Sequence, residues 1–206
     1  IYVMGDDASS NFPYFGANFW EDWERPIHFE ILEEDLSGYS ANAGVKIFGG
    51  WSRGQNQKSL SIFARSQYGY SSFEYPLFPN SEVSAYESFV LRNSGNDWTS
   101  SMLRDGFITG LADDTNIDHQ LYRPAVVYLN GEYWGIQNIR EKVNEHFLSS
   151  HHDIPSEHID LLDIQGIYSE NIVHGTNIDY LNLLDYLENN DIEDSSVQSG
   201  IEGWID

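Results

Sequence analysis

The sequence predicts an α+β fold, in which one antiparallel sheet is covered by packed helices. The first half of the chain carries short segments in which apolar and polar residues alternate, the pattern of half-buried strands. A turn at Asn130-Gly131 separates two further strand-like segments, and apolar residues at helical spacing follow it. This order, strands first and then strands mixed with helices, is typical of a single α+β domain.

Strands are expected at residues 26–33, 44–48, 59–65 and 88–92. In the earliest of these segments Ile27, Phe29 and Ile31 alternate with polar residues. Gly38 and Gly44 are expected to bound a turn region before the second strand. The short spacing of the first three strands indicates an antiparallel meander.

Two other segments of the first half are expected to be irregular. Residues 1–25 are rich in Asn, Gly, Pro and aromatic residues, and they predict an arm that packs without forming a helix. Residues 49–58 (GGWSRGQNQK) predict a polar, glycine-rich loop between two strands.

The second half opens with the clearest hairpin, which joins residues 123–130 to 132–139, because both turn residues, Asn and Gly, tolerate a positive φ. Helices are expected at residues 97–111, 140–150 and 176–189, and a strand at 158–164. Thr176 and Asp179 match a capping box. Residues 201–206 indicate an unfinished element, so the chain is expected to be a fragment at both ends.

Composition excludes several classes of protein. The net charge of −23 argues against a nucleic-acid binder, which needs a basic surface for phosphates. The absence of cysteine excludes a disulfide scaffold. Apolar runs are far shorter than the roughly 20 residues that span a bilayer, so no membrane span is expected. Lys and Arg nevertheless concentrate between residues 46 and 104, where a local cationic site can form (Lys46, Arg53, Lys58, Arg65, Arg92 and Arg104).

The glycine-rich loop is the first candidate for chemistry. A strand–loop–strand can bring its backbone close to a phosphate, and Arg53 and Lys58 can supply positive charge. In protein kinases a strand lysine is held by a helix glutamate, and Lys58 and Glu141 could take those parts. The loop matches neither common phosphate-loop pattern, so a mobile hairpin loop with solvated cations stays open as the alternative.

Other clusters are less specific. Asp97, in the segment 91–98, could bind a metal or cap the next helix, and capping is the favoured interpretation. The cluster His151, His152, Asp153 and His158 could bind zinc, but histidines at the solvated end of a helix explain it better. The acidic segment 113–118 does not have the spacing of an EF-hand. Exposed aromatic residues could also stack on carbohydrate.

Several segments together resemble one family. They are WERPIHFEILEED at 23–35, GVKIFGGWSRGQNQKSLSIFARSQYG at 44–69, YPLF at 75–78, LRNSGNDW at 91–98, LRD at 103–105 and RPAVVYLNGEYWGIQNIREKVNEHFL at 123–148. In this order they resemble the CotH family, the spore-coat-protein-H-like atypical protein kinases, over roughly residues 20–165. The resemblance implies one partial CotH-like domain over residues 1–206: the arm at 1–25, the core at 26–165 and the helical start of a later portion at 166–206.

The resemblance also implies which residues bind nucleotide. Ser52, Arg53 and Lys58 would contact the phosphates, and Glu141 would orient Lys58, with Glu145 as a competitor one helical turn away. The family often has two basic residues where this chain has Gln57-Lys58, so Lys58 would act alone. The family's catalytic and metal-binding aspartates lie further along the chain than this sequence reaches, so no catalytic or metal residue is assigned.

The resemblance implies a divergent kinase-like fold. The implied function is that of a protein kinase that binds ATP with Mg²⁺ or Mn²⁺ and phosphorylates Ser or Thr of protein partners. Without the catalytic motif, residues 1–206 are expected to be inactive alone. Partners that are basic and rich in Ser are expected from the acidic charge. An extracellular or cell-surface location, in an exported bacterial protein, is implied by the resemblance. The alternative is a surface adhesin or scaffold with the same fold and no turnover.

Overall fold

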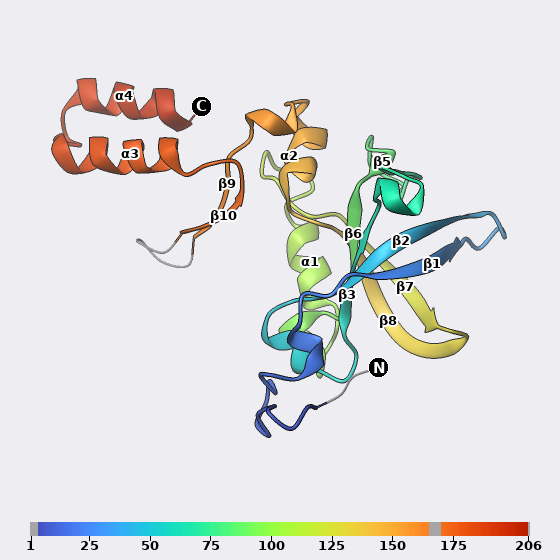
Figure 1. Ribbon diagram of the computed structural model, residues 1–206. Helices are drawn as coiled ribbons and strands as arrows, with labels where there is room; N and C mark the ends of the chain where they lie inside the picture. The colour runs from blue at the N-terminus through green and yellow to red at the C-terminus, as the bar shows by residue number, and fades with distance from the viewer. Residues whose placement is uncertain (1–3, 165–169, 206) are drawn as a thin grey trace. The chain divides into compact units, whose positions relative to one another are not determined.

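The computed structural model describes residues 4–164 and 170–205. The chain divides into two compact units, Ile1–Val143 and Asn144–Asp206. The fold is α+β, as the sequence predicts: a curled antiparallel sheet forms the first unit, and the described residues form four α-helices (Figure 1).

The six-stranded sheet has the order β1-β2-β3-β6-β8-β7, and every neighbouring pair is antiparallel. Its strands are β1 (Arg25–Leu32), β2 (Gly38–Phe48), β3 (Ser59–Phe63), β6 (Ser88–Arg92), β8 (Glu132–Glu141) and β7 (Tyr122–Leu129). The first three strands form the expected meander, and β7 and β8 form the hairpin around Asn130-Gly131. A separate two-stranded sheet pairs β4 (Phe73–Glu74) with β5 (Ala85–Tyr86), which the sequence patterns did not indicate.

One face of the large sheet carries the hydrophobic core. Leu60 and Ile62 of β3, Phe89 of β6 and Ile139 of β8 are buried there. Phe73, Leu77 and Phe78, from the segment between β3 and β6, pack against them. Aromatic rings contribute edge contacts, because Phe29, Phe73 and Phe89 meet with centroids 5.1 to 5.8 Å apart.

The opposite face is polar, and its residues follow from the strand register. Lys46, Ser61, Val90, Arg140 and Tyr122 lie directly opposite one another across five strands, so their side chains share this face. Helix α1 (Arg104–Gly110) contacts β7. Gly106 allows this contact, because a Cβ there would lie 2.5 Å from the Tyr122 ring.

The sheet curls far enough for its two edge strands to be linked. Glu33, just after β1, forms an ion pair with Arg123 of β7. The Tyr75 hydroxyl also hydrogen-bonds to Glu33. These bonds lower the pKa of the Glu33 carboxyl, chiefly through the Arg123 hydrogen bond.

Several sequence-based boundaries are wrong, three of them by five residues or more. The segment between Gly38 and Gly44 belongs to β2, where the small side chains of Ala41 and Ala43 fill the core face without giving a strong apolar signal. The helix expected at 97–111 begins only at Arg104, because Met102 has a left-handed φ of 59°. The helix expected at 140–150 begins at Glu145, because residues 140 and 141 pair with β6.

The second unit is smaller than the first and mixes helices with a two-stranded sheet. It contains α2 (Glu145–His152), β9 (Leu161–Ile164) paired with β10 (Glu170–His174), α3 (Ile178–Asn189) and α4 (Ser195–Ile205). The expected capping box does not form. Thr176 instead donates its hydroxyl to Asp160, and no side chain caps α3.

Candidate functional site

The glycine-rich loop between β2 and β3 is folded into a short turn. Residues Trp51–Gly54 form one 3₁₀ turn, in which the Arg53 N–H donates to the Gly50 carbonyl at 3.0 Å. Gly49 has a φ of 108°, and a Cβ there would lie 2.4 Å from the Ser52 Oγ. The Ser52 hydroxyl therefore lies against the Gly49 backbone, at a position that requires glycine.

Arg53 is fixed by the backbone around it. Its Nε donates to the Gly49 carbonyl at 2.6 Å, and its Nη1 donates to the Trp20 carbonyl at 3.3 Å. The guanidinium also lies 5.6 Å from the centre of the Trp20 ring, within reach of a cation–π interaction. Arg53 is thus held between its own loop and the N-terminal residues.

Lys58 ends the loop and is buried, with 4% of its surface exposed. Its Nζ donates to the Gln55 carbonyl at 2.6 Å and lies 4.0 Å from the centre of the Phe19 ring. Burial lowers the pKa of the Lys58 amine. The structure therefore places a lysine of weakened basicity at the start of β3, beneath an aromatic ring.

The ring belongs to the N-terminal arm, whose residues 12–24 contact the loop and the strands beside it. Besides Arg53 and Lys58, the arm engages Lys46 through Asp22 at 3.1 Å and Arg65 through Glu24 at 2.7 Å. Its Phe12 lies against Gly54, where a Cβ would come within 2.6 Å of the ring. Residues 12–24, which include a short 3₁₀ helix at Asn18–Trp20, therefore contact four of the cations around the loop: Lys46, Arg53, Lys58 and Arg65.

The end of the loop is anchored to two neighbouring segments. The Gln57 side chain donates to the Ile136 carbonyl and accepts from the Trp98 indole, both at 3.0 Å. Asn93 is fully buried and donates to the Gln57 carbonyl at 2.6 Å, while its side-chain oxygen accepts from the Ser59 hydroxyl at 2.9 Å. Gln57 therefore anchors the loop, at a position where the resemblance leads one to expect a second basic residue.

The structure does not bring Glu141 to Lys58. Glu141 lies on β8 and not on a helix, and its carboxylate accepts from the Leu121 N–H at 3.0 Å. Ile62, Phe89 and Glu141 are aligned across the sheet. Glu141 is therefore level with Ile62 along the strand direction. Because Lys58 precedes Ile62 by four residues, Lys58 and Glu141 lie about 13 Å apart along that direction alone. The expected Lys58–Glu141 pair is absent from this arrangement. Glu145, the competitor, belongs to the second unit and lies 3.4 Å from the His146 ring.

A different strand–helix pair exists, which the sequence patterns did not reveal. Arg92, the last residue of β6, donates its Nε to Asp105 of α1 at 2.9 Å. Arg140 of β8 donates its Nη1 to the same carboxylate oxygen at 2.8 Å. Arg140 is 1% exposed, and burial lowers its pKa. Its Nε has no hydrogen-bond partner among the described residues. The only sequence clue is the LRN…LRD spacing, which does not fix the pairing.

Asp97 has the capping role that the sequence favoured. Its carboxylate accepts from the Arg104 N–H at 3.1 Å, at the first residue of α1, and from the Ser101 hydroxyl at 2.6 Å. These bonds lower the pKa of Asp97, with the Ser101 hydroxyl as the largest cause. The cap acts across seven residues, so it holds the whole turn that precedes α1.

No metal centre is found in residues 4–164 and 170–205: no group of three or more His, Asp or Glu side chains there is placed to hold an ion. His151 and His152 lie in the last turn of α2, as expected, and the His151 ring packs on Phe147 with centroids 4.4 Å apart.

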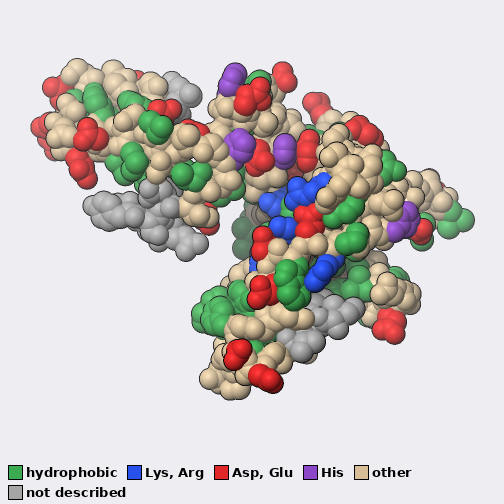
Figure 2. Space-filling model, in the orientation of Figure 1, with side chains coloured by type: hydrophobic (Ala, Val, Ile, Leu, Met, Phe, Trp, Pro, Cys, Tyr) green, Lys and Arg blue, Asp and Glu red, His purple; other side chains and the backbone are tan. Residues whose placement is uncertain are grey.

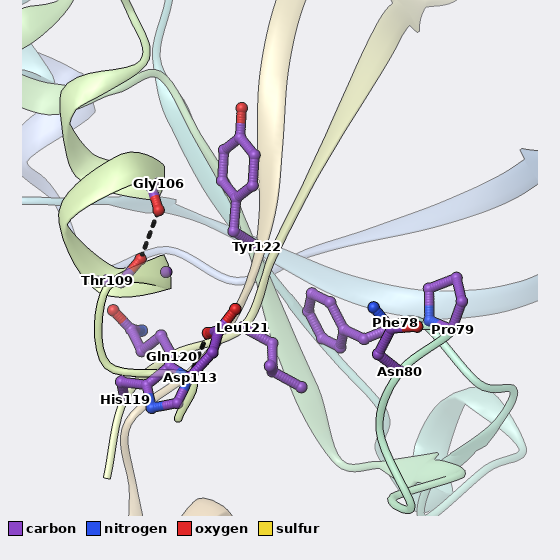
Figure 3. Close-up of a pocket in the computed structure, with 11 residues that line it drawn as sticks. Phe78, Pro79, Asn80, Gly106, Thr109, Asp113, His119, Gln120, Leu121 and Tyr122 are labelled. Atoms are coloured by element: carbon purple, nitrogen blue, oxygen red, sulfur yellow. Dashed lines mark hydrogen bonds and ion pairs between the residues drawn. The ribbon is translucent and has the colours of Figure 1, made fainter. Parts of the chain in front are cut away.

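A pocket of about 440 Å³ lies beside α1 and apart from the glycine-rich loop (Figure 3). Its lining includes Thr109 of α1, Gln120 and Tyr122, and the His119–Asp113 pair at 2.9 Å lies at the same place. Thr109 and Gln120 also accept hydrogen bonds from Arg140. The pocket therefore adjoins the partners of Arg140.

Charge is unevenly placed on the surface. Figure 2 shows Lys and Arg side chains gathered in the middle of one face, with carboxylates among them. Lys46 lies on the polar face of the sheet, and Arg92 lies at the end of β6 beside the anchored loop. Arg140 shares that face of the sheet but is buried. Such an arrangement of cations and a glycine-rich turn can bind an anion within an acidic protein.

The family model described as CotH kinase protein matches residues 45–206. The match spans most of the chain, so the protein belongs to the CotH kinase family. No curated protein matches the sequence. Among the described residues, no helix is both long enough and apolar enough to cross a bilayer.

Proposed function

We propose that this chain carries the nucleotide-binding part of a CotH-type protein kinase, with a divergent kinase-like fold that transfers phosphate from ATP to Ser or Thr of protein partners. Membership of the CotH kinase family is the observation that carries this proposal. The antiparallel sheet, with its glycine-rich turn and strand cations, supports it, because phosphoryl transfer depends on positioning and on stabilising charge.

Ser52, Arg53 and Lys58 are the proposed phosphate ligands of the loop. In the structure, the Lys58 amine donates to the Gln55 carbonyl and packs against the Phe19 ring. A phosphate can reach Lys58 only when the arm moves away from the loop. The role proposed for Glu141 is limited to fixing the segment before β7, where it accepts from the Leu121 N–H.

ATP would be bound with Mg²⁺ or Mn²⁺, which supplies charge neutralisation on the phosphates. The described residues offer no cluster to hold this ion, so no step is assigned to it. Protein partners rich in Ser and basic residues suit the net charge of −23. An extracellular or cell-surface location completes the proposal.

Nucleotide binding tests the proposal directly. Isothermal titration of the protein with ATP, in Mg²⁺ and separately in Mn²⁺, should give saturable binding. Lys58→Met, which keeps an apolar stem in the buried position, should weaken ATP binding about tenfold, as expected when a charge-assisted hydrogen bond to phosphate is lost.

Arg65→Met is the matched control, because Arg65 is also paired with the arm but lies outside the loop. It should leave ATP affinity within about twofold, as a surface charge does. Absence of ATP binding by the unchanged protein in both metals would remove the proposed function. Equal affinity for Lys58→Met and the unchanged protein would remove Lys58 from the site.

A further inference from the structure

We propose that Arg92, held by Asp105 of α1, binds a phosphate group of the nucleotide. The inference rests on the proposed function and deepens it, because it assigns a phosphate ligand outside the glycine-rich loop. It also replaces the expected Lys58–Glu141 pair by a strand–helix pair that is formed in the structure.

The guanidinium of Arg92 is oriented by a carboxylate of α1. Asp105 holds the Nε of Arg92 at 2.9 Å, which fixes the plane of the group. The terminal nitrogens, Nη1 and Nη2, have no hydrogen-bond partner among residues 4–164 and 170–205. Two parallel donors on a fixed plane match the oxygens of a phosphate, which arginine binds through two hydrogen bonds.

The charges around Asp105 are unequal in number. One carboxylate, Asp105, serves two guanidinium groups, because Arg140 donates to the same oxygen. Arg140 is buried, so its charge needs that carboxylate more than the charge of Arg92 does. The side chains of Arg92, Arg140 and Asp105 therefore sum to a charge of +1. The other carboxylate that acts on the buried Arg140 is Glu141, so Arg92 is the cation of this cluster that a ligand can reach.

Arg92 is accessible to solvent and lies close to the glycine-rich loop. The Arg92 side chain is 34% exposed, so a ligand can reach it from solution. The next residue, Asn93, is bonded to Gln57 and Ser59, so Arg92 lies next to the anchored end of the loop. A strand cation fixed by the carboxylate of a helix is also how protein kinases hold a lysine on the nucleotide phosphates.

The test compares Arg92→Gln and Arg92→Lys with the unchanged protein, by isothermal titration with Mg²⁺–ATP and, separately, with inorganic tripolyphosphate. Arg92→Gln should weaken the binding of both ligands about tenfold or more, as expected from the loss of charge-assisted hydrogen bonds. Arg92→Lys should weaken both to a smaller extent, because it keeps the charge and loses the paired donors. Arg65→Gln, with the same change of charge, should change neither affinity by more than about twofold.

The outcomes separate the two proposals. If the unchanged protein binds ATP and Arg92→Gln binds it equally well, the inference is overturned and the proposed function stands. If tripolyphosphate binds in an Arg92-dependent way and ATP does not bind, the inference stands and the proposed function fails. If neither ligand binds, both fail. Thermal unfolding checks that each variant is folded, and if Arg92→Gln unfolds, Arg92→Lys against Arg65→Lys decides: equal affinities for both ligands would overturn the inference.

Discussion

The amine of Lys58 lies 4.0 Å from the centre of the Phe19 ring. Phe19 comes from the arm and Lys58 from the end of the glycine-rich loop, so this contact joins two segments that are separated by all of β1 and β2. It explains why a lysine expected to face phosphate is buried. The arm covers the residue that the proposed function needs, and its removal from the loop should have measurable effects.

The first prediction concerns this cover. Phe19→Ala should raise the pKa of the Lys58 amine toward its ordinary value, because burial is what lowers it. A ¹⁵N NMR titration of the Lys58 Nζ resonance measures the change. Phe15→Ala is the matched control, since Phe15 belongs to the same arm and contacts Trp20 and Trp51. An identical Lys58 titration in Phe19→Ala and the unchanged protein would contradict the cover.

The second prediction concerns Asp105. Asp105→Asn removes the carboxylate that forms an ion pair with the buried Arg140, so it should lower the free energy of unfolding by about 3 kcal/mol. Asp22→Asn breaks the exposed pair with Lys46 and should cost less than about 1 kcal/mol. Urea unfolding of the two variants measures the difference, and similar losses would show that Asp105 does not hold a buried charge.

The third prediction concerns pH. The pKa of Glu33 is lowered in the folded protein, so its contribution is complete above its unfolded pKa and is lost as the pH falls through the folded pKa. Glu33→Gln should therefore reduce the free energy of unfolding by about 1 kcal/mol at pH 7, as a partly exposed pair does. The reduction should be constant down to about pH 5 and should shrink below about pH 4.

Glu34→Gln is the control for this pH profile, because Glu34 is its exposed neighbour and undergoes the same change of charge. Unfolding in urea at a series of pH values compares the two variants. If Glu33→Gln lowers the free energy of unfolding at pH 2 by as much as at pH 7, the charge of Glu33 does not contribute to the stability of the curled sheet.

The fourth prediction concerns the packing of α1 against β7. Replacing glycine by alanine inside a helix usually stabilises it by about 1 kcal/mol. Gly106→Ala should do the opposite, because the added Cβ would lie 2.5 Å from the Tyr122 ring. Gly110→Ala in the same helix meets only the Asp113 carboxylate, at 3.9 Å, and should be neutral or stabilising. Thermal unfolding of the two variants distinguishes them, and a stabilised Gly106→Ala would show that α1 does not pack closely on β7.

Local patterns predicted much of the fold. The strands with strong alternation, such as the segment containing Ile27, Phe29 and Ile31, are present in the structure. The boundaries that failed depend on tertiary contacts or backbone strain. Residues 140 and 141 extend β8 because they pair with β6, and Met102 delays α1 through its left-handed backbone.

The candidate site was predicted only in part. The loop and its cations, Arg53 and Lys58, were singled out from composition and resemblance. The partners of the cations could not be predicted. Phe19 is 39 positions from Lys58 and Asp105 is 13 positions from Arg92, and neither spacing has a local pattern. The shared use of Asp105 by Arg92 and Arg140 depends on the sheet register, which brings β6 beside β8.

Hydrogen exchange with and without Mg²⁺–ATP is the most direct test of the central claim that the glycine-rich turn and the end of β6 bind nucleotide. The account predicts slower amide exchange on ATP addition in residues 49–60 and 88–97, together with faster exchange in the arm, residues 12–24, as it leaves Lys58. Mass spectrometry of the exchanged peptides resolves these segments. If saturating ATP leaves the amide exchange of both segments unchanged, or slows exchange only elsewhere in the chain, the account is contradicted.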